Sequence, residues 1–325
     1  MGGALLAFAS AAFFGLNNAA ARRGVIKGSV LQGMAVTVPL GVPIFVAFAL
    51  VMRGFQALAD WQLSTWLWMA LAGVVHFVIG RYGNYKATQL LGATLSTPVQ
   101  QLSILVALVL GFLFLDETVN TVNLIGILLV IFGPLLLVRR RKAVTGKGQA
   151  KGFEPQYLPG MFWGAVCAFG YGTSPLFIAL ALRNDGSLAD GVAGGLVSYV
   201  TATLVVAGLL ALAGGRRALG GFDKGSTRWF LASALFVALS QLFRYLALAI
   251  APISVVVPIQ RLSVVFRLLF NAVINREHEI FDGWVIFSIL LAVAGAGALA
   301  MDSAVLLGWL GLPGRWIAAL SAPLI

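Results

Sequence analysis

The sequence predicts an all-α integral membrane protein of about ten transmembrane helices. Hydrophobic residues make up 60% of the 325 positions and charged residues only 10%, against roughly 25% charged residues in an ordinary soluble domain. The mean hydropathy is +0.96. A water-soluble fold of this length needs far more polar surface, so lipid must be the solvent for most of the chain.

Helical spans need about 20 apolar residues each to cross the hydrocarbon core. Ten stretches qualify, at approximately 3–21, 29–52, 63–86, 93–115, 121–138, 158–182, 192–213, 229–250, 253–274 and 283–301. Trp61, Trp163 and Trp284 stand near the ends of such stretches, where indole rings lie at the level of the lipid headgroups. Because the first residues carry no basic cluster, we expect 3–21 to be a retained span rather than a cleaved signal peptide.

The two parts of the chain repeat at an offset of 160 residues. The matching pairs are Tyr85 and Tyr245, Pro98 and Pro258, Gln100 and Gln260, Ser103 and Ser263, and Glu117 and Glu277. Chance similarity between Leu- and Ala-rich helices does not select Pro, Gln and Glu at one spacing. We therefore predict a first five-helix repeat over 1–138, a basic linker over 139–157, a second five-helix repeat over 158–301 and an apolar C-terminal tail over 302–325, lying at the membrane interface.

An odd number of spans in each half means that the second half enters the membrane in the opposite orientation to the first. Inverted repeats of this kind have two similar arrangements, which open the centre of the protein to alternate sides of the membrane. The repeat thus favours transport by alternating access over catalysis.

Basic residues account for the net charge of +11 and gather in short loops around 22–27, 139–151 and 216–228. The positive-inside rule places these loops in the cytoplasm and both termini outside. We expect the protein in the cell (inner, cytoplasmic) membrane. No aromatic or polar readout residues accompany the clusters, which argues against a nucleic-acid partner.

A single cysteine, Cys167, rules out an internal disulfide, and one cysteine with two histidines gives no metal-binding pattern. We expect no metal, no cofactor and no enzymatic activity.

Cations, but no carboxylates, fall deep in the predicted spans. All acidic residues lie in loops or at span ends, whereas Arg81, Lys86, Arg244, Arg261 and Arg267 lie within or just inside spans. An arginine at the centre of a helix costs about 2.5–3.5 kcal/mol on insertion scales. Such cations either snorkel to the interface, as an alternative for Arg81, Lys86 and Arg267, or face a cavity that receives a carboxylate or phosphate.

Candidate substrate-binding residues follow from this placement. Arg81, Asn84 and Tyr85 share one face of the third span, and their counterparts in the repeat are Gln241, Arg244 and Tyr245, which we expect nearby at the middle of the membrane. In the ninth span a helix break is expected at Pro258; Gln260 and Arg267 share a stripe, while Arg261 points elsewhere. Further candidates are Asn17, His76, Gln100 and Gln101. His76 could carry a proton near neutral pH, or could simply be a packed core histidine.

Short motifs close each half. Leu115-Asp116-Glu117-Thr118 is followed by Gly126 and Gly133, and the second half has Asn275-Arg276-Glu277-His278-Glu279 followed by Gly295. In these features the chain resembles the drug/metabolite transporter superfamily in its ten-helix, EamA-like form. The resemblance implies a transporter of metabolites such as amino acids, sugars, nucleotide derivatives or drugs.

The combined expectation is a secondary transporter, an exporter or exchanger, for a small metabolite bearing an anionic group such as a carboxylate or phosphate. Its partners would be the small-molecule substrate and membrane lipid, and the protein would be a monomer or weak homodimer. The alternative is a flippase for an anionic lipid or lipid-linked sugar. A third reading, a membrane lipid-phosphate enzyme, would have to use His278 with Glu277 and Glu279.

Overall fold

The computed structural model describes residues 2–115, 119–129, 131–132, 156–182, 186–274, 287, 290–291, 294–295, 298 and 302–324. Within these residues the chain is a helical bundle, with one isolated backbone bridge between Asn120 and Pro323. The all-α membrane fold predicted from composition is therefore confirmed. The motifs after Leu115 and after Ile274, most of the linker and most of the tenth predicted span lie outside the described residues.

Seven helical stretches are long and apolar enough to cross a membrane. They are Gly2–Lys27, Val30–Val51, Leu63–Leu91, Tyr157–Leu182, Leu188–Leu212, Lys224–Ile250 and Ile253–Asn271. They match the predicted spans one to three and six to nine. The fourth predicted span appears as the shorter apolar helix Ser103–Leu115, and the fifth is described only in part, as helix over 121–129 and 131–132.

The first half consists of the following helices: α1 (Gly2–Lys27), α2 (Val30–Thr37), α3 (Gly41–Val51), α4 (Gly54–Asp60), α5 (Leu63–Gly73), the π-helix η1 (Val74–Gly80), α6 (Arg81–Gln101) and α7 (Ser103–Leu115). The second half consists of α9 (Tyr157–Leu182), α10 (Leu188–Leu212), α11 (Arg216–Leu219), α12 (Lys224–Ile250), α13 (Ile253–Gln260) and α14 (Ser263–Ile274). The tail forms α16 (Ser303–Trp309) and α17 (Gly314–Ser321).

Local sequence explains where several helices begin. Both α2 and α10 start with a capping box, in which a serine side chain and the residue three positions later exchange hydrogen bonds with each other's backbone N–H groups. The residues are Ser29 with Gln32 and Ser187 with Asp190. Such caps satisfy N–H groups that a helix start leaves without partners.

The predicted break between the third and fourth spans is wrong in position. Helix continues from Leu63 to Gln101, through η1, and the interruption comes at Leu102. The equivalent join in the second half does lie where expected, at Ala251–Pro252. The difference has a simple cause: Pro252 lacks the N–H that a continuing helix needs, whereas Gly92, at the matching position, retains it.

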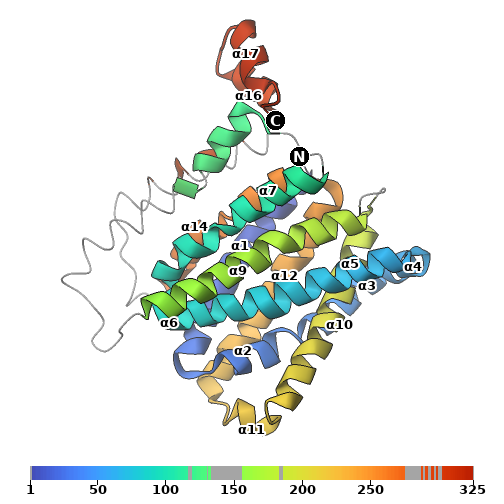
Figure 1. The fold of residues 1–325 in the computed structure, drawn as a ribbon, viewed down its shortest axis with the longest axis vertical. Coiled ribbons are helices and arrows are strands. Elements are labelled where there is room, and N and C mark those ends of the chain that lie inside the picture. Colours follow the sequence, from blue (N-terminus) through green and yellow to red (C-terminus); the bar gives the residue numbers. More distant parts are fainter. Residues whose placement is uncertain are drawn as a thin grey trace, which may run out of the picture.

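Helices of one half pack mainly on helices of the other. The α1 helix lies along α12, and α9 lies along α6; Figure 1 shows this second pair running side by side. Glycines make the approach close. A methyl group added at Gly170 would lie 2.8 Å from both the Gly80 Cα and the Val75 carbonyl oxygen.

We expect Gly170→Ala to destabilise the bundle, because the new methyl group meets backbone atoms that cannot rotate away. Overpacking of this kind costs about 1–3 kcal/mol. Gly208→Ala on α10 is the matched control, since nothing lies within 4 Å of its added Cβ and alanine is the better helix former. Heating both proteins in detergent and measuring the remaining monodisperse fraction should separate them. Equal melting temperatures would contradict close packing at Gly170.

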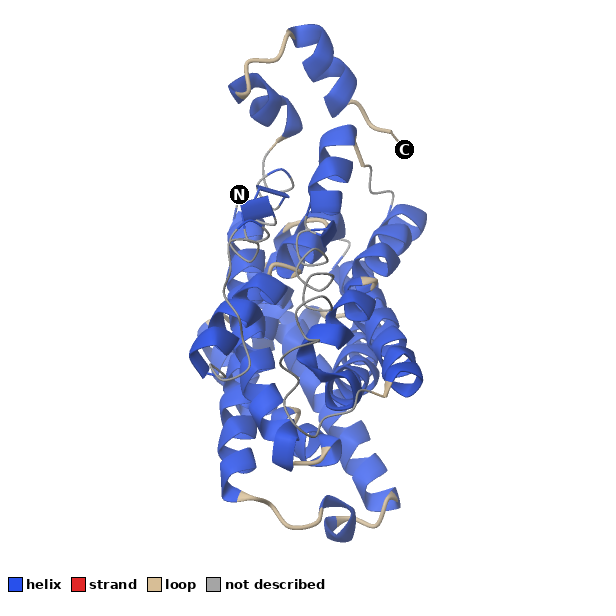
Figure 2. Cartoon of the chain, turned by 90° about the vertical axis from the view of Figure 1, so that its left-hand side faces the viewer, coloured by secondary structure: helices blue, strands red, loops and turns tan. Residues whose placement is uncertain are grey.

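The C-terminal tail extends beyond one end of the bundle, as Figures 1 and 2 show. It is attached to the segment that follows α7: the Leu324 N–H donates to the Val119 carbonyl (2.9 Å), and the Asn120 side-chain amide donates to Ser303 Oγ (2.9 Å). Trp309 and Trp316 are exposed on this tail.

Candidate functional site

A polar pocket lies inside the bundle, between the two halves. We call it the central pocket. It is lined by Ser10, Phe14, His76, Tyr171, Ser240, Gln241, Arg244, Gln260, Arg261 and Ser263. These residues come from α1, η1, α9, α12, α13, the turn after α13, and α14. None of these residues carries a carboxylate.

Arg244 is almost fully buried, and neutral side chains hold its guanidinium. Its Nη2 donates to Ser174 Oγ at 2.7 Å, and its Nη1 donates to Gln241 Oε1 at 3.1 Å. His76 Nδ1 lies 2.8 Å from the same Ser174 oxygen. These hydrogen bonds solvate the guanidinium without cancelling its positive charge. Arg244 therefore retains a buried positive charge at the pocket.

Arg261 brings a second cation to the central pocket. The sequence placed it on a different face from Gln260, and this expectation is wrong. The helix breaks directly after Gln260, where Arg261 N–H bonds to the Pro258 carbonyl and Leu262 N–H to the Ile259 carbonyl, both at 3.0 Å. This tight turn abandons the α-helical spacing on which the prediction rested. Gln260 donates to Ser10 Oγ at 2.8 Å, while the buried Arg261 Nε finds no hydrogen-bond partner among the described residues.

Aromatic rings form one wall of the central pocket. The Tyr171 ring stacks on the His76 imidazole, with ring centroids 4.4 Å apart, and meets the edge of Phe14 at 6.0 Å. The remaining open space holds about one water molecule. A metabolite can therefore enter only if the surrounding helices move apart.

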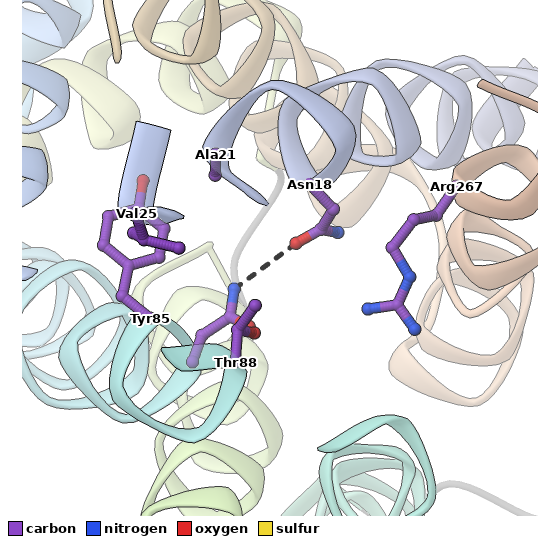
Figure 3. Close-up of a pocket in the computed structure, with 7 residues that line it drawn as sticks. Asn18, Ala21, Val25, Tyr85, Thr88 and Arg267 are labelled. Atoms are coloured by element: carbon purple, nitrogen blue, oxygen red, sulfur yellow. Dashed lines mark hydrogen bonds between the residues drawn. The ribbon is translucent and has the colours of Figure 1, made fainter. Parts of the chain in front are cut away.

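A second polar pocket lies further along the same helices. This Arg267 pocket is lined by Asn18, Ala21, Val25, Asn84, Tyr85, Thr88 and Arg267. Figure 3 shows the Asn18 and Arg267 side chains reaching it from two neighbouring helices, α1 and α14. The Asn84 amide donates to Asn18 Oδ1 at 3.5 Å and to the Tyr171 hydroxyl at 3.3 Å.

The candidates from sequence thus divide between two pockets. His76, Gln241, Arg244, Gln260 and Arg261 line the central pocket, and Asn84, Tyr85 and Arg267 line the Arg267 pocket. The clusters around Arg81 and Arg244 do not form one common site, because helical spacing fixes a face but not the depth at which neighbouring helices meet it.

Five of the candidates line neither pocket, and three of these five are buried in contacts elsewhere in the bundle. Arg81 is 1% exposed, so it does not snorkel to water. Its guanidinium donates to the Thr37 carbonyl (3.1 Å) and the Tyr199 hydroxyl (3.2 Å), and lies 4.9 Å from the centroid of the Phe77 ring. Asn17 accepts a 2.6 Å hydrogen bond from Ser233. Tyr245 is buried against the Phe45 ring, with centroids 6.3 Å apart.

The remaining candidates from the fourth span lie near the break at Leu102. The buried Gln100 Nε2 has no hydrogen-bond partner among the described residues, and the Gln101 side chain lies outside the described part of the structure. Lys86 is half-buried and donates to Gln89 at 3.1 Å.

Sequence reasoning missed Ser10, Ser174 and Tyr171. A serine in a membrane helix is common and carries no signal of its own. Tyr171 did give a signal in the sequence, because a tyrosine near the middle of an apolar span needs a hydrogen-bond partner for its hydroxyl. In the part of the chain that the structure describes, no three His, Cys, Asp or Glu side chains gather closely enough to hold a metal ion.

A bundle of helices long and apolar enough to cross a membrane is the architecture of a multi-pass membrane protein. Residues 1–139 match the model of the EamA-like transporter family. Over 137 residues the chain is 31% identical to an uncharacterized transporter in the cobO 3' region of Sinorhizobium sp, covering 40% of this chain and 92% of that protein. The chain therefore belongs to the EamA-like transporter family, within the drug/metabolite transporter superfamily.

Other relatives match over shorter parts. The magnesium transporters NIPA3 of Pongo abelii and of Homo sapiens are each 30% identical over 123 residues, which is 34% of this chain and 30% of each relative. The match thus spans less than a third of the length of these two relatives. A solved crystal structure of a protein superposes with a TM-score of 0.69 at 17% identity, covering 95% of this chain and 99% of the other. This likeness shows the fold. The family points to transport rather than to an enzyme.

Proposed function

We propose that this protein is a secondary transporter, an exporter or exchanger, of a small metabolite that bears a carboxylate or phosphate. One observation carries the proposal: Arg244 and Arg261 both line the central pocket, and none of the residues lining it is acidic. Arginine can hold a carboxylate or phosphate with two parallel hydrogen bonds.

The hydrogen bonds of Arg244 support a cargo that binds and leaves. Taking a charge out of water costs several kcal/mol, which neutral hydrogen-bond partners offset only partly. An anion in the pocket would complete the neutralisation while bound. After release, Ser174 and Gln241 would again satisfy the guanidinium N–H groups, so the empty state stays accessible.

Alternating access is the mechanism that fits this bundle. If the halves are inverted repeats, α9 and α6 correspond to α1 and α12, and these are the pairs that pack together. Both halves also interrupt a helix at the same repeat position: Leu102 N–H bonds to the Val99 carbonyl and Leu262 N–H to the Ile259 carbonyl. Two equivalent breaks, of which the one after Gln260 lies at the central pocket, support a swap between two related arrangements. The clustering of basic loops supports an assignment to the cell membrane, with those loops in the cytoplasm.

The name of the NIPA3 relatives raises magnesium as a cargo, but the central pocket argues against it here. Magnesium binds through carboxylate oxygens and retains several of its waters. Two buried guanidinium groups would repel the ion instead. We therefore propose an anionic cargo.

Thermal stabilisation of the purified protein tests this proposal. The panel contains dicarboxylates, phosphorylated metabolites, an anionic lipid, a neutral sugar and magnesium chloride. A ligand at 100 times its Kd stabilises the folded state by about 2.7 kcal/mol, so a specific anion should raise the melting temperature clearly. Stabilisation by the anionic lipid alone would favour a flippase. Stabilisation by magnesium or by the neutral sugar, with no effect of any anion, would contradict the proposed cargo class.

A further inference from the structure

The same three helical walls line both pockets. Along α1, Ser10 and Phe14 face the central pocket, and Asn18, Ala21 and Val25 face the Arg267 pocket. Along η1 and α6 the order is His76, then Asn84, Tyr85 and Thr88; along α14 it is Ser263, then Arg267. On each of these three walls, the residues that line the central pocket come earlier in the chain than those that line the Arg267 pocket. The two pockets therefore lie one after the other along one line through the bundle.

A narrow polar contact separates the central pocket from the Arg267 pocket. Asn84 lines the Arg267 pocket, and its amide donates to the hydroxyl of Tyr171, whose residue lines the central pocket. The hydrogen bonds from Asn84 to Tyr171 and to Asn18 are long, at 3.3 and 3.5 Å. Long bonds of this kind are weak and break at low cost. The contact can therefore open without disturbing the helices' backbone hydrogen bonds.

Asn84 also has unused hydrogen-bonding capacity in the Arg267 pocket. The residue is 2% exposed, and its Oδ1 finds no hydrogen-bond partner among the described residues. Leaving a buried acceptor without a partner is unfavourable, because the oxygen has lost its hydrogen bonds to water. A ligand that presents a hydroxyl or ammonium group would satisfy this oxygen, while Arg267, on the facing wall, suits a carboxylate or phosphate on the same molecule.

The Arg267 pocket lies toward the basic end of the bundle. Lys27 ends α1 and Lys224 begins α12. The Gln32 amide donates to the Leu219 and Gly221 carbonyls, at 2.7 and 3.0 Å, and so ties the loop between α10 and α12 to the start of α2. Cations gathered at one end of the bundle raise the local concentration of anions there. This is also the end that the positive-inside rule assigns to the cytoplasm.

We propose that the Arg267 pocket is a second binding station for the anionic cargo, between the basic end of the bundle and the central pocket. The station rests on the proposed transport of an anion. It takes a carboxylate or phosphate compound that also carries a hydroxyl or amino group. Asn84, with Asn18 and Tyr171, forms the contact that the cargo passes on its way to Arg244.

Thiol labelling tests the station without knowledge of the cargo. Cysteines replace Thr88 or Val25, which line the pocket, in a Cys167→Ala background, because Cys167 is the only native cysteine. The detergent-solubilised protein is treated with an anionic sulfonatoethyl or a cationic trimethylammonioethyl methanethiosulfonate. After correction for reactivity with a free thiol, we expect the anionic reagent to label roughly tenfold faster, as a nearby single positive charge predicts.

Charge variants decide the origin of this preference. Arg267→Gln should reduce the tenfold ratio to near one, and Arg267→Lys should retain most of it. Lys86→Gln, which removes a cation from the same wall helix outside the pocket, should leave the ratio unchanged. Inorganic phosphate should slow the labelling of the Thr88→Cys protein.

Three results would overturn the station: no labelling at either cysteine, equal rates for the two reagents, or a preference that survives Arg267→Gln. None of these bears on anion binding through Arg244, which the stabilisation panel measures separately. An anion panel without any binder would instead remove the proposed cargo while leaving the labelling ratio to be explained by Arg267 alone.

Discussion

Arg244→Gln should weaken binding of the stabilising anion by a factor of roughly thirty to several thousand, which corresponds to about 2–5 kcal/mol for a desolvated charge pair. The neutral amide keeps hydrogen-bonding capacity near Ser174 but loses the charge and the two-pronged geometry. The fold should survive, because no described partner of Arg244 is itself charged. Titration of the anion against melting temperature or heat of binding gives the Kd of both proteins.

Two variants calibrate this result. Arg244→Lys should recover binding only in part, since an ammonium group supplies charge without the planar fork. Arg315→Gln is the matched control: this arginine lies exposed on the tail, far from the pocket along the chain, and its loss should leave the Kd unchanged. If folded Arg244→Gln protein binds the anion as tightly as the parent, Arg244 does not hold the cargo.

Arg81→Met should have the opposite effect to Arg244→Gln: a large loss of stability with little change in anion affinity. Methionine is apolar and ends two atoms short of the guanidinium nitrogens, so it leaves the Thr37 carbonyl and the Tyr199 hydroxyl without their donor. Buried polar groups left unpaired cost about 1–3 kcal/mol each. We expect the melting temperature to fall by about 5 °C or more. The Kd, corrected for the folded fraction, should remain within about threefold of the parent value, which corresponds to less than 1 kcal/mol.

Tyr199→Phe provides the graded comparison. It removes only the hydroxyl that accepts from Arg81, so it should cost less stability than Arg81→Met and leave affinity unchanged. An Arg81→Met protein that is as stable as the parent but no longer binds the anion would place Arg81 on the transport path, as the sequence alone suggested.

The sequence predicted the fold well because the bilayer imposes a simple length and polarity rule on each span. It also identified Arg244 and Gln260 as candidates, since a polar residue in an apolar span stands out. It could not place Arg261, whose direction depends on a turn after Gln260, and it could not separate Arg81 from Arg244. Those two arginines sit in similar apolar surroundings along the chain, and only the Thr37, Tyr199 and Ser174 contacts distinguish them.

The π-helix η1 gives the bundle a joint. Arg81 N–H bonds to the His76 carbonyl, five residues back, and such a wide turn accommodates one residue more than an α-helical turn. If the hydrogen bonds of this segment moved to the usual α-helical partners, the helix after it would rotate by about 100° around its axis, which is the rotation of one residue. His76 lies before the slip point and Asn84, Tyr85 and Thr88 lie after it. An exchange of the hydrogen bonds in this segment would therefore rotate the residues that line the Arg267 pocket relative to His76 in the central pocket, while the span stays helical throughout.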